Sequence, residues 1–175
     1  MQFISSDTNV WIDFSTIHKI ELPFRLSYTY IMSKDAVEDE VLSPPGLGTE
    51  LISHGLIPVE ITTEEFYHAQ QYGTLYPRLS IYDRVALAIA KERKIVLLTG
   101  DAALRKAAAM ENVDIIGTIG ILDQLWKEGK MSSEELRDCL EQLIAHNGGA
   151  VRLPKAELER RLTTILSAQN NPDVD

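Results

Sequence analysis

Two aspartates follow apolar segments that are typical of buried strands, and their placement could create a cation site. Asp7 follows Gln2–Ser5, and Asp101 follows the apolar run Lys94–Thr99. If both segments are parallel neighbours in one sheet, both carboxylates project from the same edge, where open α/β folds bind ligands. Carboxylates that converge repel each other and lose hydration. A divalent cation with oxygen ligands, Mg²⁺ or Mn²⁺, would neutralise such a cluster.

More acids could join this edge from neighbouring helices. Asp83 lies in the first turn of a helix expected at Ile81–Arg93, although the preceding segment, Gln70–Ser80, is expected to be irregular. Four acids surround the turn after the expected strand Ser27–Met32, and only one or two of them can face inward: Asp35, Glu38, Asp39 and Glu40. A metal held by such acids can lower the pKa of a bound water and clamp a phosphodiester.

Each of these aspartates also has a plain structural explanation. Asp7 and Asp101 could cap the helices that follow them, and Asp83 could simply suit the positive end of a helix dipole. What favours a site is the joint pattern, because capping does not require acids at several strand ends together. Other sites find less support, since the four histidines are scattered, Cys139 is the only cysteine, and no phosphate-binding P-loop motif occurs.

The elements that must position these acids alternate between strand and helix. Strands are expected at Gln2–Ser5, Ser27–Met32, Ile57–Ile61, Lys94–Thr99 and Val113–Ile116. Helices are expected at Val10–Ile20, Asp35–Leu42, Ile81–Arg93, Ala102–Glu111, Ile119–Lys127 and Lys155–Ser167. Two further helices are expected. One begins after Thr63 as its N-cap, and the other begins at a capping box that runs from Ser132 to Glu135. The segment Pro44–Leu56 is expected to be a long loop.

This alternation predicts an α/β fold with a central parallel sheet and helices on both faces. At 175 residues, the chain suits one domain of ordinary size. We expect residues 1–130 to form it and residues 131–175 to form a helical extension packed on the same domain. The single cysteine and the lack of a signal peptide or an apolar span predict a cytoplasmic protein with no membrane contact.

The charge pattern is uneven. The net charge of −9 argues against a nucleic-acid binder, because phosphate contacts need a basic footprint. Between Arg78 and Lys106, however, seven basic residues accompany three acids, which makes this segment net +4. It is either a pair of solvated helix faces or a surface that faces a polyanion.

Two stretches resemble the PIN domain family. They are FISSDTNVWID near the start and YDRVALAIAKERKIVLLTGDAALRKAA later. The family pattern is an early strand ending in Asp, an acid on a short helix after the second strand, an Asp opening a helix, and a strand ending in Thr-x-Asp. The resemblance covers about residues 1 to 131. It implies a three-layer α/β/α sandwich and a ribonuclease that depends on Mg²⁺ or Mn²⁺. Many members of this family are toxins of toxin–antitoxin pairs, often dimeric, which implies an antitoxin partner and a homodimer.

The resemblance also implies roles for individual residues. The metal-binding and catalytic acids would be Asp7, Glu40, Asp83 and Asp101, with Glu38 as the rival of Glu40. Thr99 and Asn9 match polar positions of the family, and both would tune the carboxylates through hydrogen bonds.

The function expected from the sequence is therefore metal-dependent hydrolysis of RNA. Arg84, Arg105 and Lys106 could hold the RNA backbone, although Arg84 could instead pair with Asp83. One alternative is a PIN-like scaffold without activity that binds a partner protein. The other is a phosphatase of the haloacid-dehalogenase type, which wants a second acid at the position of Asn9.

Overall fold

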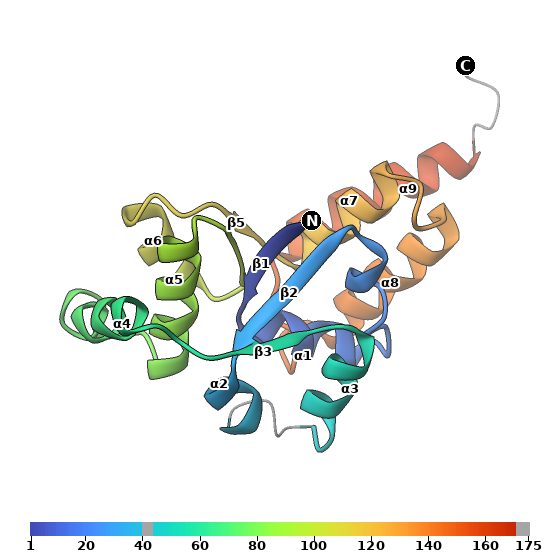
Figure 1. Cartoon of the computed structure of the whole chain (residues 1–175). Helices are drawn as coiled ribbons and strands as arrows, with labels where there is room; N and C mark the ends of the chain where they lie inside the picture. The colour runs from blue at the N-terminus through green and yellow to red at the C-terminus, as the bar shows by residue number, and fades with distance from the viewer. Residues whose placement is uncertain (40–43, 171–175) are drawn as a thin grey trace. The chain divides into compact units, whose positions relative to one another are not determined.

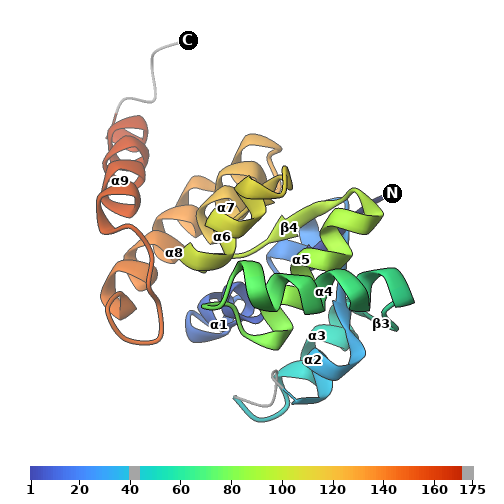
Figure 2. The same ribbon diagram turned by 90° about the vertical axis from the view of Figure 1, so that its left-hand side faces the viewer.

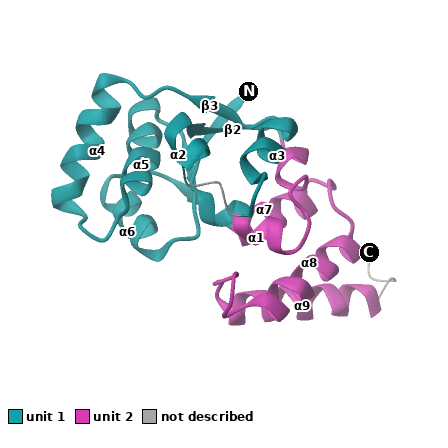
Figure 3. Ribbon diagram, turned by 90° about the horizontal axis from the view of Figure 1, so that it is seen from below, with its two compact units in different colours: residues 1–11, 27–117 teal, residues 12–26, 118–175 magenta. Residues whose placement is uncertain are grey.

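The computed structural model describes residues 1–39 and 44–170. The chain divides into two compact units, drawn in different colours in Figure 3. The first contains Met1–Trp11 and Ser27–Gly117, and the second contains Ile12–Leu26 and the described residues from Thr118 onward. The domain boundary that the sequence suggests near residue 130 stays a prediction.

The first unit is built on a parallel sheet. Within the described residues, five strands pair in the order β3-β2-β1-β4-β5. They are β1 (Gln2–Ser6), β2 (Tyr28–Ser33), β3 (Ile57–Val59), β4 (Val96–Leu98) and β5 (Ile115–Ile116). Every pair is parallel, so all carboxyl ends meet at one edge of the sheet. This confirms the predicted central parallel sheet.

The register between β1 and β4 sets the positions of the residues that follow them. Ile4 is paired with Val96 and Ser6 with Leu98, so the two strands end side by side. Leu97 and Leu98 are fully buried, in agreement with an apolar run that is covered on both faces. Asp7 therefore follows β1 at the point where Thr99 follows β4.

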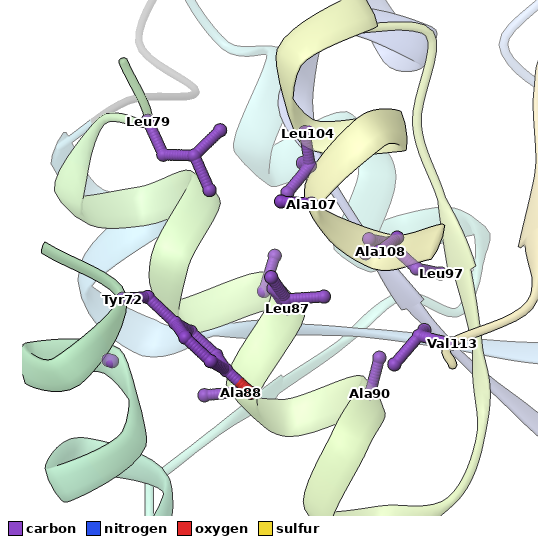
Figure 4. Packing of buried hydrophobic residues seen from close by; sticks show 12 residues of the cluster. Tyr72, Leu79, Leu87, Ala88, Ala90, Leu97, Leu104, Ala107, Ala108 and Val113 are labelled. Atoms are coloured by element: carbon purple, nitrogen blue, oxygen red, sulfur yellow. The ribbon is translucent and has the colours of Figure 1, made fainter. Parts of the chain in front are cut away.

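Three helices pack together on one face of the sheet (Figures 1 and 2). They are α4 (Thr63–Leu75), α5 (Ile81–Arg93) and α6 (Ala102–Met110). Alanines on α5 and α6 allow close approach, and they share one cluster with Leu87, Leu97 and Leu104 (Figure 4). The Ser5 hydroxyl of β1 donates to the Ala86 carbonyl over 2.8 Å, which ties α5 directly to the central strand.

The opposite face is covered by the start of α1 (Thr8–Thr16). Trp11 meets Tyr30 of β2 edge to face, with 5.1 Å between ring centres, and its indole N–H donates to the Ser6 hydroxyl. Because Ser5 and Ser6 point to opposite faces of a strand, α1 and α5 lie on opposite sides of the sheet. The predicted three-layer α/β/α sandwich is confirmed. Two short helices, α2 (Lys34–Asp39) and α3 (Leu47–His54), follow β2.

Three local predictions were wrong. The expected loop Pro44–Leu56 contains α3, which lies between two glycines with left-handed backbone, Gly46 (φ 83°) and Gly55 (φ 118°). The buried apolar residues of α3 are spaced one helical turn apart, and this spacing indicates a helix rather than a loop. The segment expected to be irregular from Gln70 is helical as far as Leu75. The N-cap of α4 is Thr62, because only Thr62 lies three residues before Glu65 and completes a capping box.

The second unit is helical. It contains the rest of α1, a 3₁₀ turn (Pro23–Arg25), α7 (Thr118–Lys127), α8 (Ser133–His146) and α9 (Lys155–Asn170). The capping box from Ser132 to Glu135 is confirmed. Arg161 of α9 forms a two-pronged ion pair with Asp123 of α7, with both N···O distances at 2.7 Å. None of the described helices is long and apolar enough to cross a lipid bilayer.

A buried ion pair joins α4 to the end of α5. The Glu65 side chain is 1% exposed and receives Arg93 Nε at 2.6 Å and the Thr62 amide at 2.8 Å. Burial alone would raise the pKa of Glu65, but the hydrogen bonds from Arg93 and Thr62 and the positive charge of Arg93 hold it below its ordinary value. Without Arg93, the buried negative charge of Glu65 would strongly destabilise the folded protein.

A second buried acid, Asp13, lies in the helical unit. It is 6% exposed, and its Oδ2 accepts a hydrogen bond of 2.6 Å from the Thr118 hydroxyl. Burial raises the pKa of Asp13 to about 6, and the hydrogen bond from Thr118 opposes this only in part. The folded protein therefore holds this proton at a pH where the unfolded chain has released it.

Replacing Arg93 by Met should lower the free energy of unfolding by about 2–3 kcal/mol, which is less than for a fully buried pair because Arg93 is partly exposed. The double variant Arg93→Met/Glu65→Gln should recover part of the loss, since no charge is left buried. Urea unfolding measures both. The explanation fails if Arg93→Met costs no more than Arg152→Met, which removes an exposed arginine.

Replacing Asp13 by Asn should change the pH dependence of stability. Asp13 favours the folded state most below pH 3.8, and this contribution is lost as the pH rises to about 6. The introduced amide does not titrate, so the variant should gain up to about 3 kcal/mol relative to wild type across this range. Urea unfolding at several pH values would show it. A difference between the two proteins that does not vary with pH would contradict the assignment.

Candidate active site at the carboxyl edge of the sheet

Asp7 is held rigidly at the end of β1. Its backbone N–H donates to the Leu98 carbonyl over 2.9 Å, so the ladder with β4 continues one residue beyond the strand. The side chain is 5% exposed. One carboxylate oxygen accepts from the Thr8 amide at 2.8 Å, and the other accepts from the Thr99 hydroxyl at 2.9 Å. The carboxylate is thus oriented by two elements at once.

Thr99 connects the two aspartates that follow β1 and β4. It is fully buried, and its hydroxyl donates to Asp7 while it accepts the Asp101 amide at 3.1 Å. Asp101 in turn caps α6, where its Oδ1 accepts the Leu104 amide at 2.8 Å. The polar residue Asn9 adds a parallel link, because its Oδ1 accepts the Gly100 amide at 3.1 Å. Both predicted supporting residues therefore lie between the strand ends.

Asp83 reaches the same edge from α5. It forms a capping box with Ser80, in which the Ser80 amide donates to Asp83 Oδ2 over 2.8 Å. Burial raises the pKa of Asp83, the hydrogen bonds from Ser80 oppose this, and the negative charge of Asp101 adds to the rise. The two carboxylates therefore lie close enough to repel each other. Asp7, Asp83 and Asp101 share one edge of the sheet.

The α2 acids are placed less uniformly. Glu40 lies outside the described residues. Ala36 is the buried residue of α2, and Glu38, two positions later, is exposed on the opposite side of the helix. Asp39 is exposed and accepts the Tyr82 hydroxyl at 2.7 Å. This bond joins α2 to the first turn of α5, one residue before Asp83.

A small pocket opens beside Asp7 between these elements. Nine residues line it, from β1, the start of α1, β2, α2 and α5: Ser5, Ser6, Asp7, Thr8, Met32, Ser33, Ala36, Tyr82 and Ala86. Sequence reasoning did not identify Tyr82, and it named Asp39 only as one of four acids around the turn after β2. One signal could have identified Tyr82. It lies next to Asp83 in the first turn of a helix, and this turn lies at the edge of the sheet that carries the acids.

The three basic residues expected to bind substrate differ in exposure. Arg84 is directed toward α4, where a Cβ added to Gly73 would lie only 2.9 Å from its Nη1. The Arg84 Nε is buried and has no hydrogen-bond partner among the described residues. Arg105 and Lys106 are exposed on α6. Burial raises the pKa of Asp83 and the positive charge of Arg84 opposes this rise only in part, and no ion pair between them is found in the described part of the chain.

Two of the structural explanations for the aspartates are also correct, because Asp101 caps α6 and Asp83 lies in the first turn of α5, where it completes a capping box. Asp7 accepts the first amide of α1. These bonds do not account for the Thr99 hydroxyl, which joins two of the acids, or for the repulsion between Asp83 and Asp101. Capping and site formation are therefore combined in the same side chains.

The donor set fits a hard divalent cation in its chemistry. Carboxylate oxygens suit Mg²⁺ or Mn²⁺, and no histidine or cysteine lines the pocket beside Asp7. Within residues 1–39 and 44–170, no three acidic, histidine or cysteine side chains converge closely enough to form a complete metal cluster by themselves. The predicted set also includes Glu40, which this part of the chain does not contain.

Comparison with known proteins agrees with this architecture. A model of the PIN domain matches residues 3–166, which is nearly the whole chain. Searches of curated proteins and of solved structures gave no match. PIN domains are generally nucleases that use divalent metal ions. The match covers the sheet, the acids at its carboxyl edge and most of the helices that follow, and the chain belongs to the PIN domain family.

Proposed function

We propose that this protein is a metal-dependent endoribonuclease that hydrolyses phosphodiester bonds in RNA. The family supplies a nuclease-type fold. The observation that carries the proposal is the Thr99 hydroxyl, which links Asp7 to the Asp101 backbone at the edge where burial, and in smaller part the charge of Asp101, raise the pKa of Asp83. Repulsion of this kind is relieved when a cation binds, which explains why the fold would maintain it.

The site residues have two roles: the acids would hold the metal ion, and their polar neighbours fix the orientation of these acids. Asp7, Asp83 and Asp101 would hold Mg²⁺ or Mn²⁺, together with Glu40, which lies outside the described residues. A bound ion of this kind supplies an activated water and neutralises charge on the phosphate. Thr99 fixes the direction of the Asp7 carboxylate, and Asn9 fixes the backbone at Gly100. No side chain has to act as a nucleophile.

The phosphatase alternative has less support. A haloacid-dehalogenase-type site would need an acid where Asn9 stands, and the Asn9 side chain is already committed to the Gly100 amide. The scaffold alternative is favoured by one observation, since no complete metal cluster is found in the described residues. A measurement of Mg²⁺ or Mn²⁺ binding distinguishes the scaffold hypothesis from the nuclease hypothesis.

The toxin role, an antitoxin partner and a homodimer rest on the sequence resemblance alone, and we retain them as proposals. A cytoplasmic location is likewise proposed, in keeping with the single cysteine, Cys139, which is fully buried. Light scattering of the purified protein measures the oligomeric state, and co-purification with the product of a neighbouring gene tests the antitoxin.

Replacing Asp7 by Asn should reduce Mn²⁺-dependent cleavage of single-stranded RNA by at least about 100-fold, because a metal ligand is lost rather than an outer-shell contact. Mn²⁺ should also raise the unfolding temperature of wild type but not of the variant, since only wild type binds the ion in its folded state. Equal cleavage by both proteins indicates a contaminating nuclease. No stabilisation of wild type by Mn²⁺ or Mg²⁺ favours the scaffold.

Replacing Thr99 by Val should lower the cleavage rate by about 10–100-fold, the usual effect of losing an outer-shell partner. Valine keeps the shape but removes both the donor to Asp7 and the acceptor for the Asp101 amide. Thr99→Ser, which retains the hydroxyl, should restore most of the activity. If Thr99→Ser is as slow as Thr99→Val at equal stability, the role of Thr99 is packing rather than alignment.

A further inference from the structure

The structure sorts the basic residues of the segment from Arg78 to Lys106 into two groups. Three of them are committed to the fold. Arg93 pairs with buried Glu65, Lys91 pairs with Glu111 at 3.7 Å, and Arg84 packs over Gly73. The other four are exposed, and their side chains form no ion pair or hydrogen bond within the described part of the chain: Arg78, Lys94, Arg105 and Lys106.

Three of these four cations lie at the edge that carries the acids. Arg78 precedes Leu79 in the connection to α5, and Arg105 follows Leu104 on α6. Both leucines belong to one cluster and lie at the same end of it (Figure 4). Lys106 is the next residue of α6, only about 6 Å along the helix from its start beside Asp101. We call Arg78, Arg105 and Lys106 the basic track.

The fourth cation lies at the other end of the strands. Lys94 ends α5 and precedes β4, and it lines a groove with residues that precede β5, including Asn112 and Asp114. Because all strands are parallel, this groove is at the amino edge of the sheet. Lys94 thus offers an exposed positive charge on the same unit but away from the acids.

The far half of the carboxyl edge has the opposite charge. Asp35, Glu38 and Asp39 are exposed on α2, after β2, and Glu60 follows β3. Lys34 is the one cation of α2, and it is paired with Glu60 at 2.9 Å. In the strand order β3-β2-β1-β4-β5, the edge is acidic at β3 and β2, whereas the helix that follows β4 is basic. Asp7 after β1 and Asp101 after β4 mark the change of sign.

We infer that a single RNA strand reaches the acids from the α6 side only, with its phosphates on the basic track. The inference rests on the proposed function of the acidic site and adds the direction and footprint of the substrate. Phosphates on the α2 side would meet exposed carboxylates, so no contacts form there. Contacts of this kind give affinity without sequence preference. They also explain how a protein of net charge −9 can bind RNA, since the footprint is local.

The test is RNA binding without cleavage. A labelled single-stranded RNA is titrated with the Asp7→Asn protein in Mg²⁺ buffer at several salt concentrations, and fluorescence anisotropy gives the affinity. Each phosphate contact on a single strand contributes about −0.7 to the slope of log affinity against log salt, so three contacts give about −2. Adding Arg78→Gln/Arg105→Gln/Lys106→Gln should bring the slope close to zero, and each single change should reduce it by about 0.7.

Two matched controls each remove an exposed cation that is not part of the basic track. Lys94→Gln and Arg152→Gln, each in the Asp7→Asn background, should leave the slope unchanged, and thermal unfolding confirms that every variant is folded. The inference is overturned if the triple variant keeps its slope, or if either control loses as much as a single track variant. It is also overturned if poly-glutamate competes as well as RNA of equal charge, which would indicate an acidic protein partner.

Failure of this inference and failure of the proposed function give different results. If wild type cleaves RNA and the triple variant binds as before, the nuclease stands and the basic track is wrong. If binding depends on the track but wild type never cleaves, the surface stands and the proposed activity is wrong.

Discussion

The site depends on one buried hydroxyl. Thr99 is completely inaccessible to solvent and donates to the Asp7 carboxylate while it accepts the Asp101 amide. A buried polar group without hydrogen bonds costs several kcal/mol, and the Thr99 hydroxyl and the Thr8 amide supply hydrogen bonds to both carboxylate oxygens of Asp7. The same contact brings the ends of β1 and β4 together, so the alignment of the acids and the alignment of the strands are one constraint.

The surrounding acids are placed by helix termini rather than by a dedicated scaffold. Ser80 turns Asp83 toward its own helix start, and Asp101 satisfies an amide of α6 that has no partner within the helix. These local bonds offset part of the repulsion between the two carboxylates. Stability and site geometry therefore use the same hydrogen bonds, and a substitution at either aspartate affects both.

Much of the sheet could be predicted, because apolar runs such as that before Thr99 are strong strand signals and parallel strands place their ends together. Asp7 and Asp101 follow directly from this rule. The extent of α4 was missed because Gly73 and its neighbours have low helix propensity, and packing against α5 overrides it. Gly73 is also what admits the Arg84 guanidinium, so the direction of Arg84 could not be read from its neighbours in the sequence.

The contact between Tyr82 and Asp39 was out of reach for a related reason. It joins side chains 43 positions apart whose separate patterns are those of ordinary surface residues. Asp13 has the same difficulty, because an acid on a short helix usually faces solvent and only the tertiary structure buries it beside Thr118. Residues whose role arises from one long-range contact carry no periodic signal.

The 92 positions between Asp7 and Thr99 have a consequence for how the protein is made. During translation, the amino-terminal aspartate leaves the ribosome long before the strand that orients it exists. Contacts between distant segments form late, because the intervening chain must first be brought into place. An unfinished polypeptide that lacks β4 also lacks Thr99, so it cannot orient the Asp7 carboxylate or place it beside Asp101.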